Sequence, residues 1–443
     1  MAMHGGHELI EIVAALVLTV GGAAIVARGW LIRGRGDRGA GGAPLSADRP
    51  GTGRSTDGLV VVLSGAAAAI HLAAGPEHVE ALGDVGLGFY WAALLQGGCA
   101  VAWVVAGRSS RLAVFAIALN AVLIAVSYMV LLERKVIAWV QSRLGPMRVG
   151  PYGILQPVAD AVKLMIKEDI TPVRADRWVF TAAPIISMVP ALIVYAVIPF
   201  GPKITLFGRQ VALYITDINV GLLYIVSVAS VGVYGIILAG YASNSKFPLL
   251  ASLRASAQLI SYEVAVTLTL VSVILMSGTL SMVGIVDAQY NQHVWYIVAQ
   301  PIAFVLVLIG GLAETNRAPF DLPEAEQELT GGFHTEYSGM RFALFFLAEY
   351  ANMIVVSSVV TTLFLGGWLP PFPNTAALHF LYAIPSWVWF FLKSFCFLYL
   401  FIWVRATLPR YRYDQLMALG WKFLIPLAIV NLVVTGIVKV LMR

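Results

Sequence analysis

Charged residues are scarce in this sequence. Asp, Glu, Lys and Arg make up only 12% of its 443 residues, whereas 59% of the residues are hydrophobic and the mean hydropathy is +0.82. Soluble globular proteins carry roughly 25% charged residues. The composition therefore excludes a soluble globule and predicts a polytopic membrane protein.

Cysteine is nearly absent as well. Cys99 and Cys396 lie far apart, each inside a hydrophobic run, so no cysteine cluster can hold an iron–sulfur centre or a structural zinc ion. We expect both to be free, buried thiols, and we expect no metal site and no nucleic-acid partner. The sequence also lacks a P-loop and a GxGxxG turn after a strand, which excludes nicotinamide, flavin and nucleoside triphosphate sites on this chain.

Hydrophobic runs of membrane-spanning length are abundant. A helix needs about 20 apolar residues to cross the hydrocarbon layer, and eight such runs lie near residues 112–132, 177–199, 218–242, 255–278, 295–313, 342–366, 386–404 and 421–441. We predict an all-α fold in which residues 111–443 form a bundle of eight transmembrane helices. Residues 1–110 are expected to form a hydrophobic extension of unknown role, with up to three further helices near 8–28, 58–75 and 85–106.

Positively charged residues are concentrated in every second loop of the core. Because cytoplasmic loops carry the positive excess, this distribution indicates the orientation of the core. The outward loops hold Lys203 and Arg209, and the long polar segments, rich in Lys and Arg, are expected to face the cytoplasm. The extension does not fit, because three spanning helices would place the six arginines of residues 28–54 outside. Its topology stays open. Its N-terminus lacks the charged region of a cleavable signal peptide.

The polar segment of residues 133–172 contains two Gly-Pro turns, at Gly145 and Gly150, and then an amphipathic stretch. Asp160, Lys163 and Lys167 lie opposite an apolar stripe, which is the pattern of a helix in the membrane interface. The stripe consists of Ile154, Leu155, Val158, Val162, Met165 and Ile166. Two interpretations remain: an ordinary juxtamembrane helix, or a lateral doorway for an amphiphilic substrate between the lipid and the cytoplasmic face.

Glu263 lies inside the predicted span of residues 255–278. A carboxylate at such a depth costs roughly 2.5–3.5 kcal/mol on insertion scales, so it must face a polar interior or be neutral. The functional interpretation is a group that accepts and releases a proton. The alternative is a packing carboxylate that hydrogen-bonds to Tyr262 or to a serine.

The segment ETNRAPFDLPEAEQELTGGFHTEYSG, residues 314–339, concentrates acid at a membrane surface. Its carboxylates, with one from the next span, are Glu314, Asp321, Glu324, Glu326, Glu328, Glu336 and Glu349. Such groups indicate the start of a buried proton path or of a head-group site, with a solvated loop as the alternative.

A further polar segment, residues 405–426, is basic and aromatic. Arg410, Arg412 and Trp421 are expected to anchor it at the interface. Docking of an acidic soluble partner is the second interpretation.

Four segments together resemble a known family. ERKVIAWVQSRLGPMRVGPYGILQPVADAVKLMIKED, SNSKFPLLASLRASAQLISYE, AETNRAPFDLPEAEQELTGGFHTEYSGMRFALFFLAEY and LPRYRYDQLMALGWKFLIP resemble, in this order, segments of the membrane-embedded H subunit of respiratory complex I, the proton-pumping NADH:quinone oxidoreductase. The resemblance covers about residues 111–443. Two residues depart from the family pattern: Met147 stands where the family usually has Asn, and Gln327 where Ser is common. Neither departure removes a charge. The extension before residue 111 is a larger departure.

The resemblance implies an enzyme subunit that joins the membrane arm to the hydrophilic arm and forms the membrane part of a quinone chamber. It assigns to the chamber Glu133, Arg134, Asp160, Lys163, Arg317, Asp321, Glu324, Glu326 and Glu328. It assigns to a proton path Glu263, Glu314, Glu336 and Glu349. It also implies quinone as substrate, no redox centre on this chain, and FMN, NADH and iron–sulfur clusters on partner subunits, with antiporter-like subunits beside it in a bacterial inner or plasma membrane.

Several alternatives stay open at this stage. The membrane subunit of energy-converting hydrogenases shares the ERK and Gly-Pro region but lacks the acidic segment, and a complex-I-like enzyme with another electron donor would use the same chain. An independent proton-coupled transporter would also explain buried acids, although no inverted repeat is visible. In the extension, His71, His78 and Gln96 suggest haem or metal ligation. The alternative is that the histidines are hydrogen-bonded structural residues, which is the commoner role of histidine in membranes.

Overall fold

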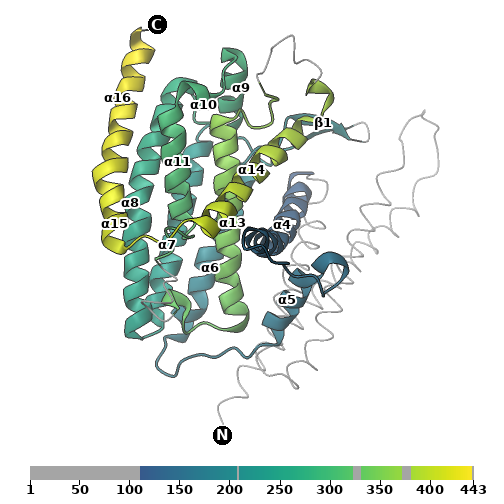
Figure 1. Ribbon diagram of the computed structural model, residues 1–443. Helices are drawn as coiled ribbons and strands as arrows, with labels where there is room; N and C mark the ends of the chain where they lie inside the picture. Colours follow the sequence, from purple (N-terminus) through teal and green to yellow (C-terminus); the bar gives the residue numbers. More distant parts are fainter. Residues whose placement is uncertain (1–109, 207–208, 323–330, 372–380, 442–443) are drawn as a thin grey trace, which may run out of the picture. The chain divides into compact units, whose positions relative to one another are not determined.

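The computed structural model describes residues 110–206, 209–322, 331–371 and 381–441 (Figure 1). The chain divides into two units, Met1–Ala116 and Ile117–Arg443, and the account below concerns the second. Several predicted features lie outside the described residues: the extra N-terminal helices, Cys99, His71, His78, Gln96, Glu324, Glu326 and Glu328.

Long apolar helices form this unit. They are α4 (Ser110–Val140), α6 (Arg177–Ile193), α7 (Gly221–Ala242), α8 (Lys246–Ser277), α11 (Pro301–Glu314), α13 (Gly339–Phe364), α14 (Ser386–Thr407) and α16 (Ile425–Leu441). Each of the eight predicted spans overlaps one of them. Within the described ranges, six helical segments are long and apolar enough to cross a membrane, and α11 is a shorter apolar helix. The prediction of a polytopic helical membrane protein is confirmed.

Short elements occupy the two ends of the bundle (Figure 1). One end carries α9 (Met282–Gln292), α10 (Tyr296–Ala299) and an antiparallel hairpin of β1 (Lys203–Leu206) and β2 (Arg209–Ala212). The other end carries α5 (Gln156–Ile166) and α15 (Tyr413–Leu419). The all-α prediction omitted the hairpin, because a four-residue strand within an outward loop has no periodicity that distinguishes it from coil.

Three helix boundaries differ from the prediction. The helix α4 continues through Glu133 to Val140, because the charged groups that suggested a loop find partners in the fold. The helix α8 begins at Lys246 and not near residue 255. The predicted span of residues 295–313 is split at Gln300, since Pro301 starts a new helix and disfavours helical geometry in the residue before it.

Small and polar residues join the helices in the interior. Gly235 of α7 lies so close to Ser187 of α6 that a Cβ there would meet the Ser187 nitrogen at 2.7 Å. Deeper in the bundle, Gln300 accepts a hydrogen bond from Ser272 of α8 at 2.8 Å and donates one to Thr435 of α16 at 3.1 Å. Close backbone approach and interhelical hydrogen bonds of this kind drive helix association in membranes, where lipid is as apolar as the core.

The prediction of a buried thiol is wrong for Cys396. This residue lies on α14, and its side chain is exposed on the surface of the unit. A hydrophobic sequence does not distinguish a helix face that packs on protein from one that faces lipid, since both are apolar.

Candidate functional site: a buried arginine–carboxylate cluster and its cavities

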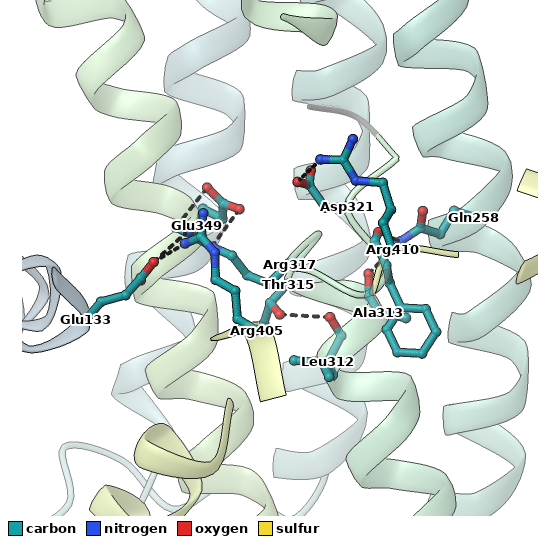
Figure 2. A network of polar contacts seen from close by, with 11 residues as sticks. Glu133, Gln258, Leu312, Ala313, Thr315, Arg317, Asp321, Glu349, Arg405 and Arg410 are labelled. Atoms are coloured by element: carbon teal, nitrogen blue, oxygen red, sulfur yellow. Dashed lines mark hydrogen bonds and ion pairs between the residues drawn. The ribbon is translucent and has the colours of Figure 1, made fainter. Parts of the chain in front are cut away.

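Two arginines and two glutamates from four elements meet in the interior. Figure 2 shows Arg317 lying between Glu133 of α4 and Glu349 of α13, with Arg405 of α14 approaching Glu133. The Arg317 Nε lies 2.9 Å from Glu349 Oε1, its Nη1 lies 3.6 Å from Glu133 Oε1, and Arg405 pairs with the same Glu133 oxygen. The Arg317 side chain is 2% exposed and the Glu133 side chain 6%. We call these four residues the arginine–carboxylate cluster.

Aromatic rings complete the environment of Arg317. Its guanidinium carbon lies 4.2 Å from the centre of the Tyr350 ring and 5.5 Å from that of Phe346, both on α13. A cation over the face of an aromatic ring is stabilised by the ring quadrupole, most strongly where water is excluded. Arg317 is therefore fixed by ionic and aromatic contacts with one helix at once.

Hydrogen bonds connect the loop that carries Arg317 to the neighbouring helices. Thr315 Oγ1 donates a hydrogen bond to the Leu312 carbonyl at 2.9 Å, which closes the end of α11. Gln258 of α8, fully buried, donates to the carbonyls of Ala313 at 3.0 Å and Phe320 at 2.8 Å, one on each side of Arg317 (Figure 2). Both carbonyls also accept backbone hydrogen bonds, from the Asn316 and Leu322 amides, so Gln258 gives each a second bond and connects the loop to α8.

Asp321 forms a second ion pair at the end of this loop. Arg410 Nη2 lies 2.8 Å from Asp321 Oδ2 (Figure 2). The neighbouring rings of Phe320 and Tyr411 stack with centres 5.7 Å apart, and the Tyr411 amide donates to the Pro319 carbonyl at 3.0 Å. Arg410 was expected to be an interfacial anchor; instead it joins the loop of residues 315–321 to the segment after α14.

Trp421 and Arg412, the other two expected anchors, differ from each other. Trp421 Nε1 donates to Ser261 Oγ of α8 at 3.1 Å. Arg412 is 75% exposed and pairs with Asp414 at 3.2 Å, in keeping with a residue at the polar surface.

Two adjoining cavities extend from the cluster into the bundle. The smaller, of about 40 Å³, is lined by Glu349 and Glu314; the larger, of about 120 Å³, is lined by Glu314 and Glu263. Residues lining both are Ser187, Ile236, Glu314, Asn316 and Asn352. The larger volume accommodates several water molecules. Glu349, Glu314 and Glu263, which the resemblance assigns to one path, thus line two neighbouring cavities that have Glu314 in common.

Glu263 contacts a serine. Ser230 Oγ of α7 donates to the Glu263 carboxylate, and both residues line the larger cavity with Thr267. The Tyr262 hydroxyl, the other partner considered, donates to the Leu416 carbonyl at 3.0 Å. The serine contact is compatible with a packing carboxylate, and Glu263 also lines the larger cavity, whose wall is mostly apolar with a few polar side chains such as Ser230 and Thr267.

The helix α5 carries a separate group of predicted residues. Arg134 Nη1 lies 2.6 Å from Asp160 Oδ2, and Gln156 Nε2 donates to Asp160 Oδ1 at 2.9 Å. Lys163 is exposed on the same helix. The predicted apolar stripe is present: Ile154, Leu155, Val158, Val162 and Ile166 are between 46% and 55% exposed, whereas Met165 is partly covered.

Glu336 is not brought to the cavities. It lies between η4 (Gly332–His334) and α13, partly buried, and among the described residues it lines neither space. Its neighbour Tyr337 stacks on Phe180 of α6 with ring centres 3.9 Å apart. Burial raises the pKa of Tyr337, so the phenol keeps its proton and donates to the Phe180 carbonyl at 3.1 Å.

Arg405, Gln258, Asn316 and Asn352 were not predicted as site residues. Arg405 was visible only as one of several positive loop residues, and Gln258 as part of a polar run in a span. A polar amide inside an apolar helix is itself a signal of a buried hydrogen bond. Among the described residues, no group of three or more His, Cys, Asp or Glu could hold a metal ion.

Comparisons with known proteins agree with the resemblance. Residues 113–436 match a family model described as NADH dehydrogenase. The first of two NADH-quinone oxidoreductase H subunits of Geobacter metallireducens is 52% identical over 74% of this chain and 95% of its own length. The H subunit of Thermomicrobium roseum is 52% identical over 72% of this chain and 93% of its own, and that of Frankia casuarinae 54% identical over 72% and 69%. The chain therefore belongs to the NADH dehydrogenase family of membrane proteins that contains the H subunit of NADH-quinone oxidoreductase.

Proposed function

We propose that this chain is the quinone-chamber membrane subunit of a proton-translocating NADH:quinone oxidoreductase. It links quinone reduction at the hydrophilic arm to proton translocation in the membrane arm. The family membership favours this function over that of an independent transporter or of a hydrogenase component.

Quinone reaches the chamber from the lipid past α5. The exposed apolar stripe of α5 supplies a surface for the isoprenoid tail, because burial of apolar area is the favourable term for such a chain. The Arg134–Asp160 pair holds this helix beside α4, whose Glu133 belongs to the cluster. Glu324, Glu326 and Glu328 complete the chamber in this proposal, together with Lys163, Arg317 and Asp321.

Protons or charge shifts pass from the cluster toward Glu263. Glu349 contacts Arg317 and lines the smaller cavity, Glu314 lines both cavities, and Glu263 lines the larger. A change in the charge near Glu133 therefore alters the electrostatic energy of Arg317 and, through Arg317, that of Glu349. Glu336 contributes at the surface end of this path.

The partners follow from the same proposal. Iron–sulfur and quinone-site subunits of the hydrophilic arm, with FMN and NADH, dock on the cytoplasmic face that carries α5 and the basic segment after α14, and antiporter-like subunits adjoin the membrane face. Residues 111–443 form the domain that corresponds to the H subunit and residues 1–110 an extension before it; the family match over residues 113–436 supports this division. The membrane is the plasma membrane or inner membrane of a bacterium.

The observation that carries the proposal is the contiguity of the cluster with cavities that reach Glu263. The test is purification of the tagged protein in mild detergent, with an assay for inhibitor-sensitive NADH:quinone reduction and mass spectrometry of the co-eluting chains. We expect iron–sulfur and antiporter-like subunits together with activity. A chain that elutes alone and is inactive with quinone would contradict the proposal, whereas recovery with a different electron-input subunit would identify another donor.

A further inference from the structure

The helix α5 lies at the surface of the described unit. None of its residues, Gln156–Ile166, is buried. At its beginning the Arg134–Asp160 pair and a hydrogen bond from Lys135 Nζ to the Tyr152 carbonyl, at 2.5 Å, connect it with α4. Because its side chains, Leu164 and Met165 among them, are at most partly buried, polar contacts at its two ends contribute to its placement besides its packing on α13.

The tie at the other end joins the segment after α5 to the first turn of α13. Ser338 Oγ donates to the Glu168 carbonyl at 2.8 Å and accepts from the Ile170 amide at 2.9 Å. Arg341 Nε lies 3.1 Å from Asp169 Oδ2, and its Nη1 donates to Thr171 Oγ1 at 2.8 Å. We call Ser338, Arg341, Asp169 and Thr171 the α5–α13 clip.

The α13 side of the clip is held firmly. The Arg341 guanidinium lies 5.4 Å from the centre of the Phe180 ring, which stacks on Tyr337. Gly339 has a positive φ of 54°, and a Cβ there would lie 3.1 Å from the Lys167 carbonyl oxygen at the end of α5. A side chain at Gly339 would thus meet both strain and a close contact, and the end of α5 rests directly on backbone.

We propose that Arg341 and Ser338 are positioning residues that hold the apolar stripe of α5 in the place where it guides the quinone tail. This inference rests on the proposed function. Within the described part of the chain, the clip residues line neither of the two cavities and belong to a group separate from the arginine–carboxylate cluster, so their effect on the reaction passes through the position of α5. The clip therefore determines how well a long tail is accommodated and leaves the head-group chemistry unchanged.

The test is the quinone-tail dependence of Arg341→Gln in the intact, purified complex reconstituted in liposomes. The acceptors are quinones with one and with ten isoprene units, carrying the head group that the wild-type complex reduces. Loss of a charge-assisted pair should raise KM for the long-tailed quinone by about threefold to tenfold. With the short-tailed quinone KM and kcat should stay within about twofold of wild type. Ser338→Ala should act in the same direction, and Arg341→Lys should restore part of the loss.

Arg174→Gln is the matched control, because Arg174 lies in the segment after α5, close in sequence to Asp169 and Thr171, and its side chain is exposed. Unchanged KM values for both quinones in Arg341→Gln would overturn the positioning role. So would an equal fall of kcat with both quinones, or a loss of assembled complex on a native gel, since these indicate a general structural role. A wild-type complex that reduces no quinone would refute the proposed function itself and, with it, this inference.

Discussion

Arg317 is the residue whose loss should destabilise this chain most strongly among the arginines of the site. Its side chain is 2% exposed and pairs with Glu349 through two nitrogens, at 2.9 and 3.2 Å. Removing one partner of a buried ion pair costs about 3–5 kcal/mol, because the remaining charge loses its compensation. Arg317→Gln should therefore lower the free energy of unfolding by about that amount.

The neighbouring charges sharpen this prediction. Glu133 keeps Arg405 when Arg317 is replaced, so Glu349 is the carboxylate most affected by the loss of the Arg317 charge. The double variant Arg317→Gln with Glu349→Gln should then be more stable than Arg317→Gln alone. Glu349→Gln alone should cost less, because Arg317 keeps Glu133 and the Tyr350 ring.

The assay is SDS-induced unfolding of the purified chain in mild detergent, followed by tryptophan fluorescence and circular dichroism. Arg412→Gln is the matched control: this arginine is 75% exposed, and an exposed pair contributes about 0–1 kcal/mol. Equal effects of Arg317→Gln and Arg412→Gln would refute the reasoning. Strictly additive losses in the double variant would refute it as well, since they would show that Arg317 and Glu349 are not coupled.

Three further predictions concern separate parts of the bundle. Glu263→Gln should lower quinone-linked turnover of the complex and leave its assembly on a native gel intact; a normal rate would remove this carboxylate from the mechanism. Gly240→Ala should destabilise the chain by about 1–3 kcal/mol in the same SDS titration, because its Cβ would lie 2.5 Å from Ser252 Cβ, whereas Gly436→Ala, with open space around it, should not. Lys393→Met should cost about 1–3 kcal/mol, because Lys393 donates to three carbonyls of residues 365–369, and an unchanged unfolding midpoint would contradict this.

The positions of the helices were predictable because apolar runs of spanning length carry enough information by themselves. Amphipathicity located α5, whose stripe is exposed as expected. Hydropathy gave a wrong prediction at two places. Pro301 divides a predicted span, and Cys396 faces outward on an apolar helix. Neither feature changes the hydrophobicity of the segment in which it lies.

The site residues divide in a similar way. A carboxylate inside a span, such as Glu263, is conspicuous in the sequence because its burial is costly. Its connection to Glu314 and Glu349 through cavities is a property of packing and cannot be read from spacing. Arg405 shows the limit most clearly: it pairs with Glu133 across 272 residues, and nothing in a basic loop indicates which distant acid its arginine will meet.

The distribution of charge around the cavities explains why Arg317 has a central position. The cluster is balanced, with two arginines facing two glutamates. The described lining of the larger cavity, in contrast, holds Glu263 and Glu314 but neither Lys nor Arg. Glu349 lies at the join, since it pairs with Arg317 and lines the smaller cavity. Arg317 therefore contacts both Glu133, which Arg405 also neutralises, and Glu349 at the edge of the smaller cavity.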